Sequence, residues 1–361
     1  MRDALQAIVD RDVARYAEMP GRMLAVLAPE ADVEVAAGLA DRATGEPLTP
    51  GRRFRIASVT KPFVAATALR LWEDGRLDLD APIAELVAPE TTELLRSGSY
   101  DPGRITTRHL LTHTSGIFDF TADAYGPMTD DGFMAAIRAD PGHRWSREEQ
   151  LRFAIDHGRP YGEPGSVFVY SDTGANLVGE IVERLTGTSL GAAIREHLGF
   201  ARLGLRHTFH ESIEPEPEGL PPPAAQYEAD FDVARYDASV DLWGGGGLVS
   251  TCRDLAVFFR ALLRGEVFRD PSTLRVMQTV PSARAHDPGD ARAAREAANT
   301  GMFLFRERVG DLETWGHSGY WGTVAASCPS LDVTVVAQDG QAWMPDGYRK
   351  SAVVGEVLRL F

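Results

Sequence analysis

The spacing of apolar residues near the start of the chain predicts a helix, a hairpin and a second helix. Residues 2–19 place apolar side chains on one face at the helical period, between charged neighbours. Two short apolar runs follow at 23–28 and 33–40, and the turn-forming residues between them predict a β-hairpin. A helical pattern returns at about 58–73 and ends at a glycine.

The middle of the chain has a mostly helical pattern, interrupted by loops rich in proline and glycine. From about residue 301 four short strand-like runs follow, and a final helix is predicted over roughly 346–360. Because strands and a helix occur at both ends, we expect an α/β (α+β) fold. Residues 1–81 and 236–361 would form a mixed domain around a sheet, and residues 82–235 an inserted, mostly helical domain.

Charge and hydropathy then limit the possible partners. Hydrophobic residues make up 44 % of the chain and charged residues 25 %, as in ordinary globular proteins. The formal net charge of −15 argues against nucleic acids and anionic membranes, because the protein's field repels both. No apolar run reaches the roughly 18 residues of a spanning helix, and residues 1–20 lack a signal-peptide core. We expect a small-molecule or peptide substrate and a cytoplasmic location, unless a leader has been removed.

Lysine and cysteine are both rare in this chain. Of 37 lysines and arginines, only Lys61 and Lys350 are lysines. Lys350 lies in the predicted final helix and is expected to be solvated, whereas Lys61 follows Ser58 by three positions. The two cysteines, Cys252 and Cys328, are expected to be buried free thiols, with a disulfide as the alternative.

The Ser58–Lys61 spacing suits nucleophilic catalysis. Residues three apart on a helix lie on one face, about 5–6 Å apart at Cβ. A serine hydroxyl is a weak nucleophile until a neighbouring group takes its proton. Lysine can do this when its surroundings favour the neutral amine, whereas arginine stays protonated. A solvated lysine near a helix start remains the alternative, because the spacing alone is only suggestive.

Further stretches, all in one order along the chain, carry a family resemblance. The sequence resembles the serine β-lactamase and penicillin-binding-protein superfamily. Within it, the similarity is to the branch of class C β-lactamases, D-alanyl-D-alanine carboxypeptidases, D-aminopeptidases and related esterases. The matching stretches are RIASVTKPF (55–63), EDGRLDLDAPI (73–83), ITTRHLLTHTSGIFDF (105–120), EPGSVFVYSDTGANLVGEIVE (163–183), GGLVSTCRDLAVF (246–258) and GHSGYWGT (316–323).

The resemblance implies a β-lactamase/transpeptidase-like fold, with an antiparallel sheet flanked by helices and a mostly helical domain. It makes Ser58 the acylated nucleophile and Lys61 its partner, while Tyr170 shuttles protons to the leaving group. The backbone N–H groups of Ser58 and Tyr320 would form the oxyanion hole. No metal or cofactor is implied. The resemblance also implies five substrate-binding residues: Asp172, His317, Ser318, Gly319 and Trp321.

Two positions depart from the best-known members of this branch. Asp172 stands where they have asparagine, and a carboxylate can only accept hydrogen bonds. Asp172 is instead expected to pair with Lys61 and to leave Tyr170 more of the base role. His317 stands where many members have lysine, and histidine is mostly neutral at pH 7. With the bulky Tyr320-Trp321 pair, these departures weaken the case for efficient β-lactam hydrolysis.

Other motifs give weaker signals. His109 and His113 have a spacing that could hold a metal, but the stretch lacks the usual glutamate and a third ligand. The resemblance assigns this stretch a structural role. No serine lies in a G-x-S-x-G motif, so an α/β-hydrolase nucleophile elbow is not supported. The glycine run 244–247 lacks the residues of a phosphate-binding loop and predicts close backbone approach near the site.

We therefore expect a serine hydrolase that acts through an acyl-enzyme. The favoured substrate is a D-amino-acid-containing peptide or amide, or a small ester. A D-alanyl-D-alanine carboxypeptidase or a class C-type β-lactamase is the nearer alternative. An acyl-serine binding or sensor protein with little turnover is the alternative from a different functional class.

Overall fold

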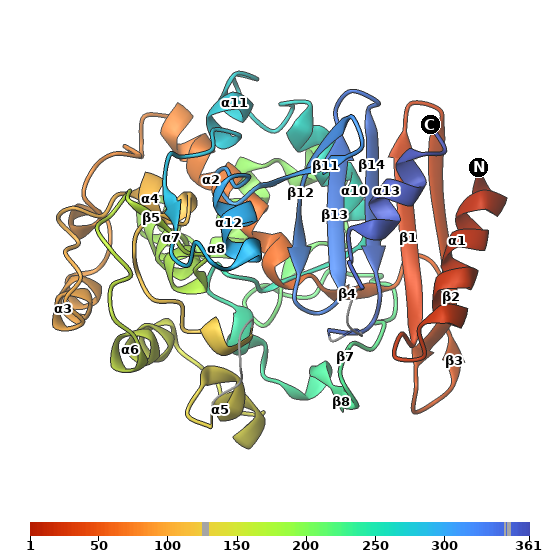
Figure 1. The fold of residues 1–361 in the computed structure, drawn as a ribbon, viewed down its shortest axis with the longest axis horizontal. Coiled ribbons are helices and arrows are strands. Elements are labelled where there is room, and N and C mark those ends of the chain that lie inside the picture. Colours follow the sequence, from red (N-terminus) through yellow and green to blue (C-terminus); the bar gives the residue numbers. More distant parts are fainter. Residues whose placement is uncertain (125–129, 343, 345–347) are drawn as a thin grey trace.

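The computed structural model describes residues 1–124, 130–342, 344 and 348–361. Within this part of the chain, strands from both ends form one seven-stranded antiparallel sheet in the order β11-β12-β13-β14-β1-β2-β3 (Figure 1). Its strands are β1 (Gly21–Ala28), β2 (Ala31–Asp41), β3 (Glu46–Pro47), β11 (Phe305–Val309), β12 (Leu312–Gly319), β13 (Thr323–Cys328) and β14 (Val333–Gln338). The predicted fold class is therefore confirmed.

Helices cover both faces of the sheet. α1 (Arg2–Arg15) and α13 (Ala352–Leu358) pack on one face, and α10 (Cys252–Leu263) packs on the other (Figure 1). Successive residues of β13 alternate between the two faces, with Val324 and Ala326 in the α1–α13 layer and Ala325 in the α10 layer. The edge formed by β11 and β12 faces the helical part of the molecule.

Helix α2 (Lys61–Glu73) joins the sheet layer to the helical part. Most of its residues are buried, and it contacts α7 (Asp172–Thr186) and α8 (Leu190–His197). On the sheet side, the ring of Phe63 stacks on Phe258 of α10 with centroids 3.5 Å apart. A helix that is apolar all round is suited to this central position. Its first turn is therefore held between the sheet edge and the other helices.

The remaining elements are short. The helices are α3 (Pro89–Ser97), α4 (Thr107–Leu111), α5 (Phe133–Ala139), α6 (Arg147–His157), α9 (Phe200–Leu203), α11 (Thr273–Met277) and α12 (Ala291–Ala297). The strands are β4 (Arg53–Arg55), β5 (Val167–Phe168), β6 (Phe209–His210), β7 (Tyr227–Glu228), β8 (Phe231–Asp232), β9 (Leu248–Thr251) and β10 (Arg284–Ala285). Among the described residues, no helix combines the length and the apolar character needed to cross a bilayer.

The predicted elements differ from the observed ones mainly at their ends. The first helix stops at Arg15, and Tyr16 is already extended ahead of Pro20. The last helix spans Ala352–Leu358, and residues 346 and 347 of its predicted range lie outside the described residues. Both cysteines are buried free thiols, as expected. The domain boundaries at 82 and 235 stay a prediction.

A buried arginine ties the first helix to the end of the sheet. Arg22 of β1 is 2 % exposed, and its Nε donates to Asp339 Oδ1 at 2.7 Å. Its other nitrogens donate to Asp12 of α1 and to the Tyr348 hydroxyl. Because Asp339 follows β14 and Tyr348 precedes α13, one guanidinium links four segments.

Replacing this arginine should destabilise the fold strongly. Arg22→Met removes the buried cation from Asp339 and leaves Asp12 only its half-exposed partner Arg11, so we expect a loss of about 3–5 kcal/mol in the free energy of unfolding. Arg11→Met is the matched control, because Arg11 pairs with the same Asp12 from a half-exposed position and should cost less than about 1 kcal/mol. Urea unfolding curves measure both. Equal losses in the two variants would contradict the importance of the buried network.

Candidate active site

Ser58 lies on a tight turn directly before α2. The turn is the 3-10 helix η1 (Ala57–Thr60), so Ser58 precedes the α-helix that the sequence pattern predicted it would open. Ala57 has φ +47°, a conformation that residues with a side chain rarely adopt. Backbone strain of this kind is typical of functional turns. Ser58 itself is 4 % exposed.

Lys61 is fully buried and has three hydrogen-bond acceptors. Its Nζ donates to Ser58 Oγ at 2.9 Å, to the Gly245 carbonyl oxygen at 2.7 Å, and to Asp172 Oδ1. An ammonium group has three N–H donors, so this set of acceptors satisfies it completely. The expected pair between Lys61 and Asp172 is therefore present, and the serine hydroxyl is part of the same cluster.

The glycine run 244–247 makes this cluster possible. A Cβ atom on Gly245 would lie 2.5 Å from Asp172 Oδ1, and one on Gly244 would lie 2.4 Å from the Ala175 carbonyl oxygen. Side chains at these positions would push the run away from α7. The predicted close approach of this backbone is confirmed, and the carbonyl of Gly245 uses it to reach Lys61.

Tyr170 lies beside the same two side chains. Its ring centroid is 4.9 Å from Lys61 Nζ, and its hydroxyl is hydrogen-bonded with Ser58. Burial, reinforced by the Asp172 carboxylate, raises the pKa of Tyr170 well above its usual value. The phenol is therefore neutral and suited to relaying a proton. This differs from the expectation that Asp172 would give Tyr170 more of the base role.

The end of β12 packs directly against the turn that carries Ser58. A Cβ on Gly319 would lie 2.4 Å from the carbonyl oxygen of Ile56, two residues before Ser58. Only glycine permits this approach, which brings the backbone of Tyr320 next to the turn. The side chain of Ser318 is exposed, and the Tyr320 hydroxyl donates to Glu228 at 2.9 Å. The role of the Ser58 and Tyr320 N–H groups as oxyanion donors stays a prediction.

His317 is buried and neutral. Its Nδ1 is 2.8 Å from the Ser318 carbonyl oxygen, and its Nε2 has no hydrogen-bond partner among the described residues. Burial, with a contribution from the Lys61 charge, lowers the pKa of His317 to about 3. An imidazole in this state accepts a hydrogen bond at Nε2 and carries no charge with which to bind a carboxylate.

Two side chains lie elsewhere than the sequence indicated. Trp321 is 4 % exposed and packs on the ring of Tyr236, with centroids 6.0 Å apart, instead of lining a cavity. Lys350 was expected in solvent, but its Nζ donates to the carbonyl oxygens of Gly319 at 2.9 Å and Tyr320 at 3.1 Å. Its side chain is partly buried, and this desolvation lowers the pKa of Lys350 to about 8.

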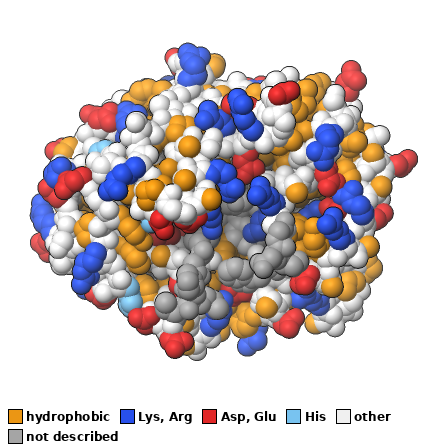
Figure 2. Space-filling view, viewed as in Figure 1, with side chains coloured by type: hydrophobic (Ala, Val, Ile, Leu, Met, Phe, Trp, Pro, Cys, Tyr) orange, Lys and Arg blue, Asp and Glu red, His pale blue; other side chains and the backbone are white. Residues whose placement is uncertain are grey.

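A cavity of about 680 Å³ opens onto the site. Tyr170 and residues 316–320 form part of its wall, whereas Ser58 does not line it. Basic residues surround the cavity in spite of the acidic net charge, and Figure 2 shows them gathered around the hollow of this face. The charged lining residues are Arg292, Arg295, Arg306, Arg308, Arg349 and Lys350, with Glu296 and Glu307.

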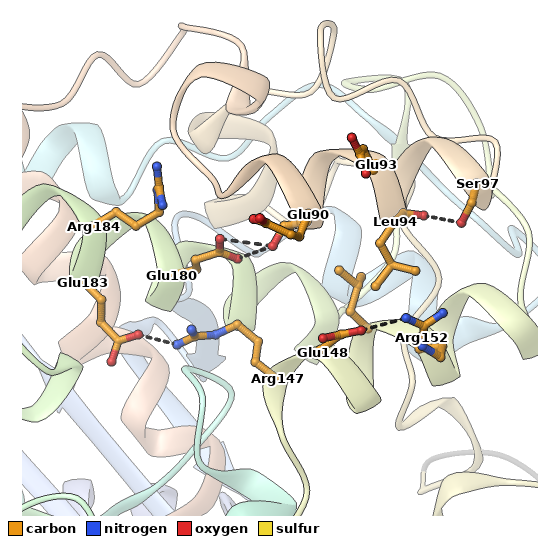
Figure 3. A pocket seen from close by; sticks show the side chains of 12 residues that line it. Glu90, Glu93, Leu94, Ser97, Arg147, Glu148, Arg152, Glu180, Glu183 and Arg184 are labelled. Carbon is orange, nitrogen blue, oxygen red and sulfur yellow. Dashed lines mark hydrogen bonds and ion pairs between the residues drawn. The ribbon is translucent and has the colours of Figure 1, made fainter.

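A second cavity lies between α3, α6 and α7 and contains none of the predicted site residues (Figure 3). Several of its charged side chains already have partners. Arg147 pairs with Glu183 at 2.6 Å, and Arg152 pairs with Glu148 at 2.7 Å. The Glu180 carboxylate accepts from the Ala88 backbone at 2.7 Å. Nothing in this arrangement points to catalysis.

The two histidines of the HLLTH stretch do not act as a pair. His109 Nδ1 accepts from the Thr106 backbone at 3.2 Å and caps α4. His113 Nδ1 accepts from the Ser171 backbone at 3.1 Å, and its ring lies 4.5 Å from that of Tyr170. These contacts give each imidazole a structural role, as the resemblance implied. Among the described residues, no group of side chains could hold a metal ion.

One family model matches most of the chain, from residue 9 to residue 338, and its description is beta-lactamase. The chain belongs to the beta-lactamase family. Among its curated relatives, esterase EstB from Burkholderia gladioli is 38 % identical over 192 residues, which is 52 % of this chain and 45 % of the esterase. The chain spans about half the length of the first curated relatives that it matches.

Solved structures of this beta-lactamase-family fold extend the comparison to the whole chain. A D-stereospecific amidohydrolase from Streptomyces sp. has a TM-score of 0.78 at 26 % identity and covers 96 % of both chains. D-amino acid amidase from Ochrobactrum anthropi SV3, complexed with L-phenylalanine, also has a TM-score of 0.78 at 26 % identity. That match covers 100 % of this chain and 98 % of the amidase.

Sequence reasoning missed one buried acid of this beta-lactamase-family site. Asp119 is 3 % exposed and accepts from the backbone N–H of Asp172 at 3.0 Å and from the Thr121 hydroxyl at 2.9 Å. Asp119 therefore holds Asp172 in place, and Asp172 in turn accepts a hydrogen bond from Lys61. Burial and the Asp172 carboxylate raise the pKa of Asp119 to about 7. Its place in the matched stretch 105–120 was the one available signal.

The raised pKa of Asp119 predicts a pH-dependent stability. In the unfolded chain an aspartate loses its proton near pH 4, whereas folded Asp119 keeps it up to about pH 7. The contribution of protonated Asp119 to the free energy of unfolding is therefore complete at low pH and is lost as pH rises through about 7. Asp119→Asn removes this dependence. The free energy of unfolding of Asp119→Asn minus that of wild type should therefore increase by about 1–3 kcal/mol when the pH is raised from about 4.5 to about 8.

Denaturant unfolding at the two pH values measures this change. Asp3→Asn, on the exposed side of α1, is the control for the loss of one charge. If the difference in unfolding free energy between Asp119→Asn and wild type stays constant with pH, Asp119 ionises normally and the prediction is contradicted.

Proposed function

We propose that this protein is a serine hydrolase that works through an acyl-enzyme at Ser58. The observation that carries the proposal is the 2.9 Å hydrogen bond between Ser58 Oγ and the fully buried Nζ of Lys61. A buried amine in contact with a serine hydroxyl is the arrangement that serine activation requires. The esterase and amidase names of the relatives support the same class of reaction.

The proposed reaction begins when Ser58 Oγ attacks the carbonyl carbon of an amide or ester. Lys61 takes the serine proton as it passes one of its own to Asp172, with which it is hydrogen-bonded. Tyr170 then delivers its hydroxyl proton to the leaving nitrogen or oxygen and regains a proton from Lys61, while Lys61 recovers its own proton from Asp172. The N–H groups of Ser58 and Tyr320 stabilise the oxyanion. Water, or another acceptor that binds well, completes the reaction by attacking the acyl-enzyme.

The proposed substrate is a D-amino-acid-containing peptide or amide, or a small ester. Similarity to a D-amino acid amidase and to an esterase supports these two classes. Neutral His317 and acidic Asp172 argue against efficient hydrolysis of β-lactams. D-alanyl-D-alanine carboxypeptidase activity is the alternative. The basic cavity favours a substrate whose distal end carries a carboxylate, because its lining has more cations than anions.

Acyl labelling tests the roles of the serine and the lysine. Ser58→Ala should abolish labelling by a serine-reactive acyl probe, and Lys61→Arg should reduce it about 100-fold or more, because arginine cannot accept the proton. Ser97→Ala, on the exposed end of α3, is the matched control and should label normally. Intact-mass analysis over time measures the adduct. Normal turnover by Lys61→Arg would refute the proton-acceptor role of Lys61.

The same time course separates turnover from simple acyl binding. An adduct on the wild-type protein that decays as product accumulates identifies an enzyme. An adduct that persists indefinitely identifies an acyl-serine sensor, which is the alternative from a different functional class.

A substrate panel tests the charge of the cavity. It contains p-nitrophenyl esters, D- and L-aminoacyl amides, nitrocefin, and D-peptides ending in a carboxylate or in the neutral carboxamide. We expect kcat/KM to be about threefold or more higher for the carboxylate peptide than for its carboxamide at low salt. The advantage should shrink in high salt, since salt screens the cavity charges. A preference for the carboxamide would contradict the assignment.

A further inference from the structure

The second lysine of the chain contacts the backbone of the site. Lys350 lies between β14 and α13, about thirty residues after the end of β12. Its Nζ donates to the carbonyl oxygens of Gly319 at 2.9 Å and Tyr320 at 3.1 Å. The Gly319 oxygen also accepts from the Gly322 backbone at 3.3 Å in the turn to β13. Two donors therefore converge on one carbonyl.

The chemistry of a peptide group gives this contact a consequence. The Gly319 carbonyl and the Tyr320 N–H belong to one planar, trans peptide, so they point in opposite directions. A cation on the oxygen withdraws electron density and makes the N–H on the other side a stronger donor. Cooperative strengthening of about 10–30 % per bond is the estimated size of such an effect. The oxygen is also fixed in place, which fixes the direction of the N–H.

We propose that Lys350 is a positioning residue that holds and polarises the Gly319–Tyr320 peptide, so that the Tyr320 N–H binds the oxyanion more strongly. The inference rests on the proposed function, which assigns this N–H to the oxyanion hole. Gly319 packs on Ile56, so the peptide that Lys350 holds is also seated on the turn that carries Ser58. The lysine acts on the reaction only through this peptide.

The surroundings of Lys350 fit this role. The side chain is partly buried, and its Nζ donates to two uncharged carbonyl oxygens. Asp339 favours its charge, while Arg292 and burial oppose it. With a pKa of about 8 the side chain is still mainly an ammonium at neutral pH. A compact ammonium reaches two adjacent carbonyls, whereas the planar fork of arginine has a different geometry.

Cysteine substitution followed by chemical restoration of the cation tests the proposal. Lys350→Cys should lower kcat for a p-nitrophenyl ester about tenfold and change KM less than about threefold, because the oxyanion forms only after binding. Affinity for a boronic acid, which forms a tetrahedral oxyanion on Ser58, should fall by a similar factor. Aminoethylation of the new thiol with 2-bromoethylamine rebuilds a lysine-like ammonium and should restore both quantities.

Three controls isolate the role of the charge. Alkylation of Lys350→Cys with iodoacetamide, which adds a neutral group, should restore neither quantity. Wild type treated with 2-bromoethylamine shows whether the buried Cys252 and Cys328 react. Arg359→Cys, on the exposed end of the last helix, should keep its kcat before and after treatment. Lys350→Met supplies the same comparison of kcat and KM if the cysteine variant folds poorly.

The outcomes separate this inference from the proposed function. If Ser58→Ala and Lys61→Arg lose activity but Lys350→Cys keeps wild-type kcat, the positioning role is overturned and the hydrolase remains. A loss of kcat that aminoethylation does not repair also overturns it, because a purely structural anchor would behave in that way. If Ser58→Ala keeps full activity, the proposed function itself fails.

Discussion

The site depends on the burial of one ammonium group. Lys61 lies in the interior, where an unpaired charge would be very costly, so its three N–H donors must all find acceptors. The three acceptors come from three segments: the turn that carries Ser58, the start of α7, and the glycine run 244–247. Each segment is constrained in turn. The run needs glycine at Gly245, and the start of α7 needs Asp119 beneath it. The position of the Ser58 hydroxyl therefore follows from the hydrogen-bond requirements of Lys61.

The sheet supplies the other wall of the site, and both chain ends hold it in place. Strands from the two termini pair in one sheet, and Arg22 joins α1, β1 and the end of β14. The strand β12, which lies next to the edge strand β11, is thereby fixed against the turn that carries Ser58, and Gly319 approaches this turn closely. The charges near Lys61 and most of the charges that line the cavity are of opposite sign. The carboxylates of Asp172 and Asp119 lie near Lys61 inside the protein, while arginines line the cavity whose wall includes Tyr170 and residues 316–320.

The parts of the site that the sequence could predict are the local ones. Ser58 and Lys61 are three residues apart, and the place of Tyr170 before a helix follows from the motif and the apolar pattern. The four C-terminal strands could be predicted because their apolar runs are short and separated by turns. Contacts between segments that are far apart in the chain could not be predicted from the sequence. The position of Lys350 depends on how the chain returns to the sheet after β14, and Trp321 turns into the core because Tyr236 packs there.

The use of lysine at only two positions now has a physical explanation. Surface pairs in this chain are made by arginine, whose planar fork binds carboxylates with two hydrogen bonds, as Arg108 binds Asp80. Neither buried site offers that geometry. Lys61 needs a compact head with donors toward a hydroxyl, a carbonyl and a carboxylate, and its proposed role requires that it can lose a proton. Lys350 faces two successive backbone oxygens on a tight turn. Arginine serves the carboxylate pairs of this protein, at the surface and at buried Arg22, and lysine is kept where a small ammonium must bind backbone or a hydroxyl in a confined space.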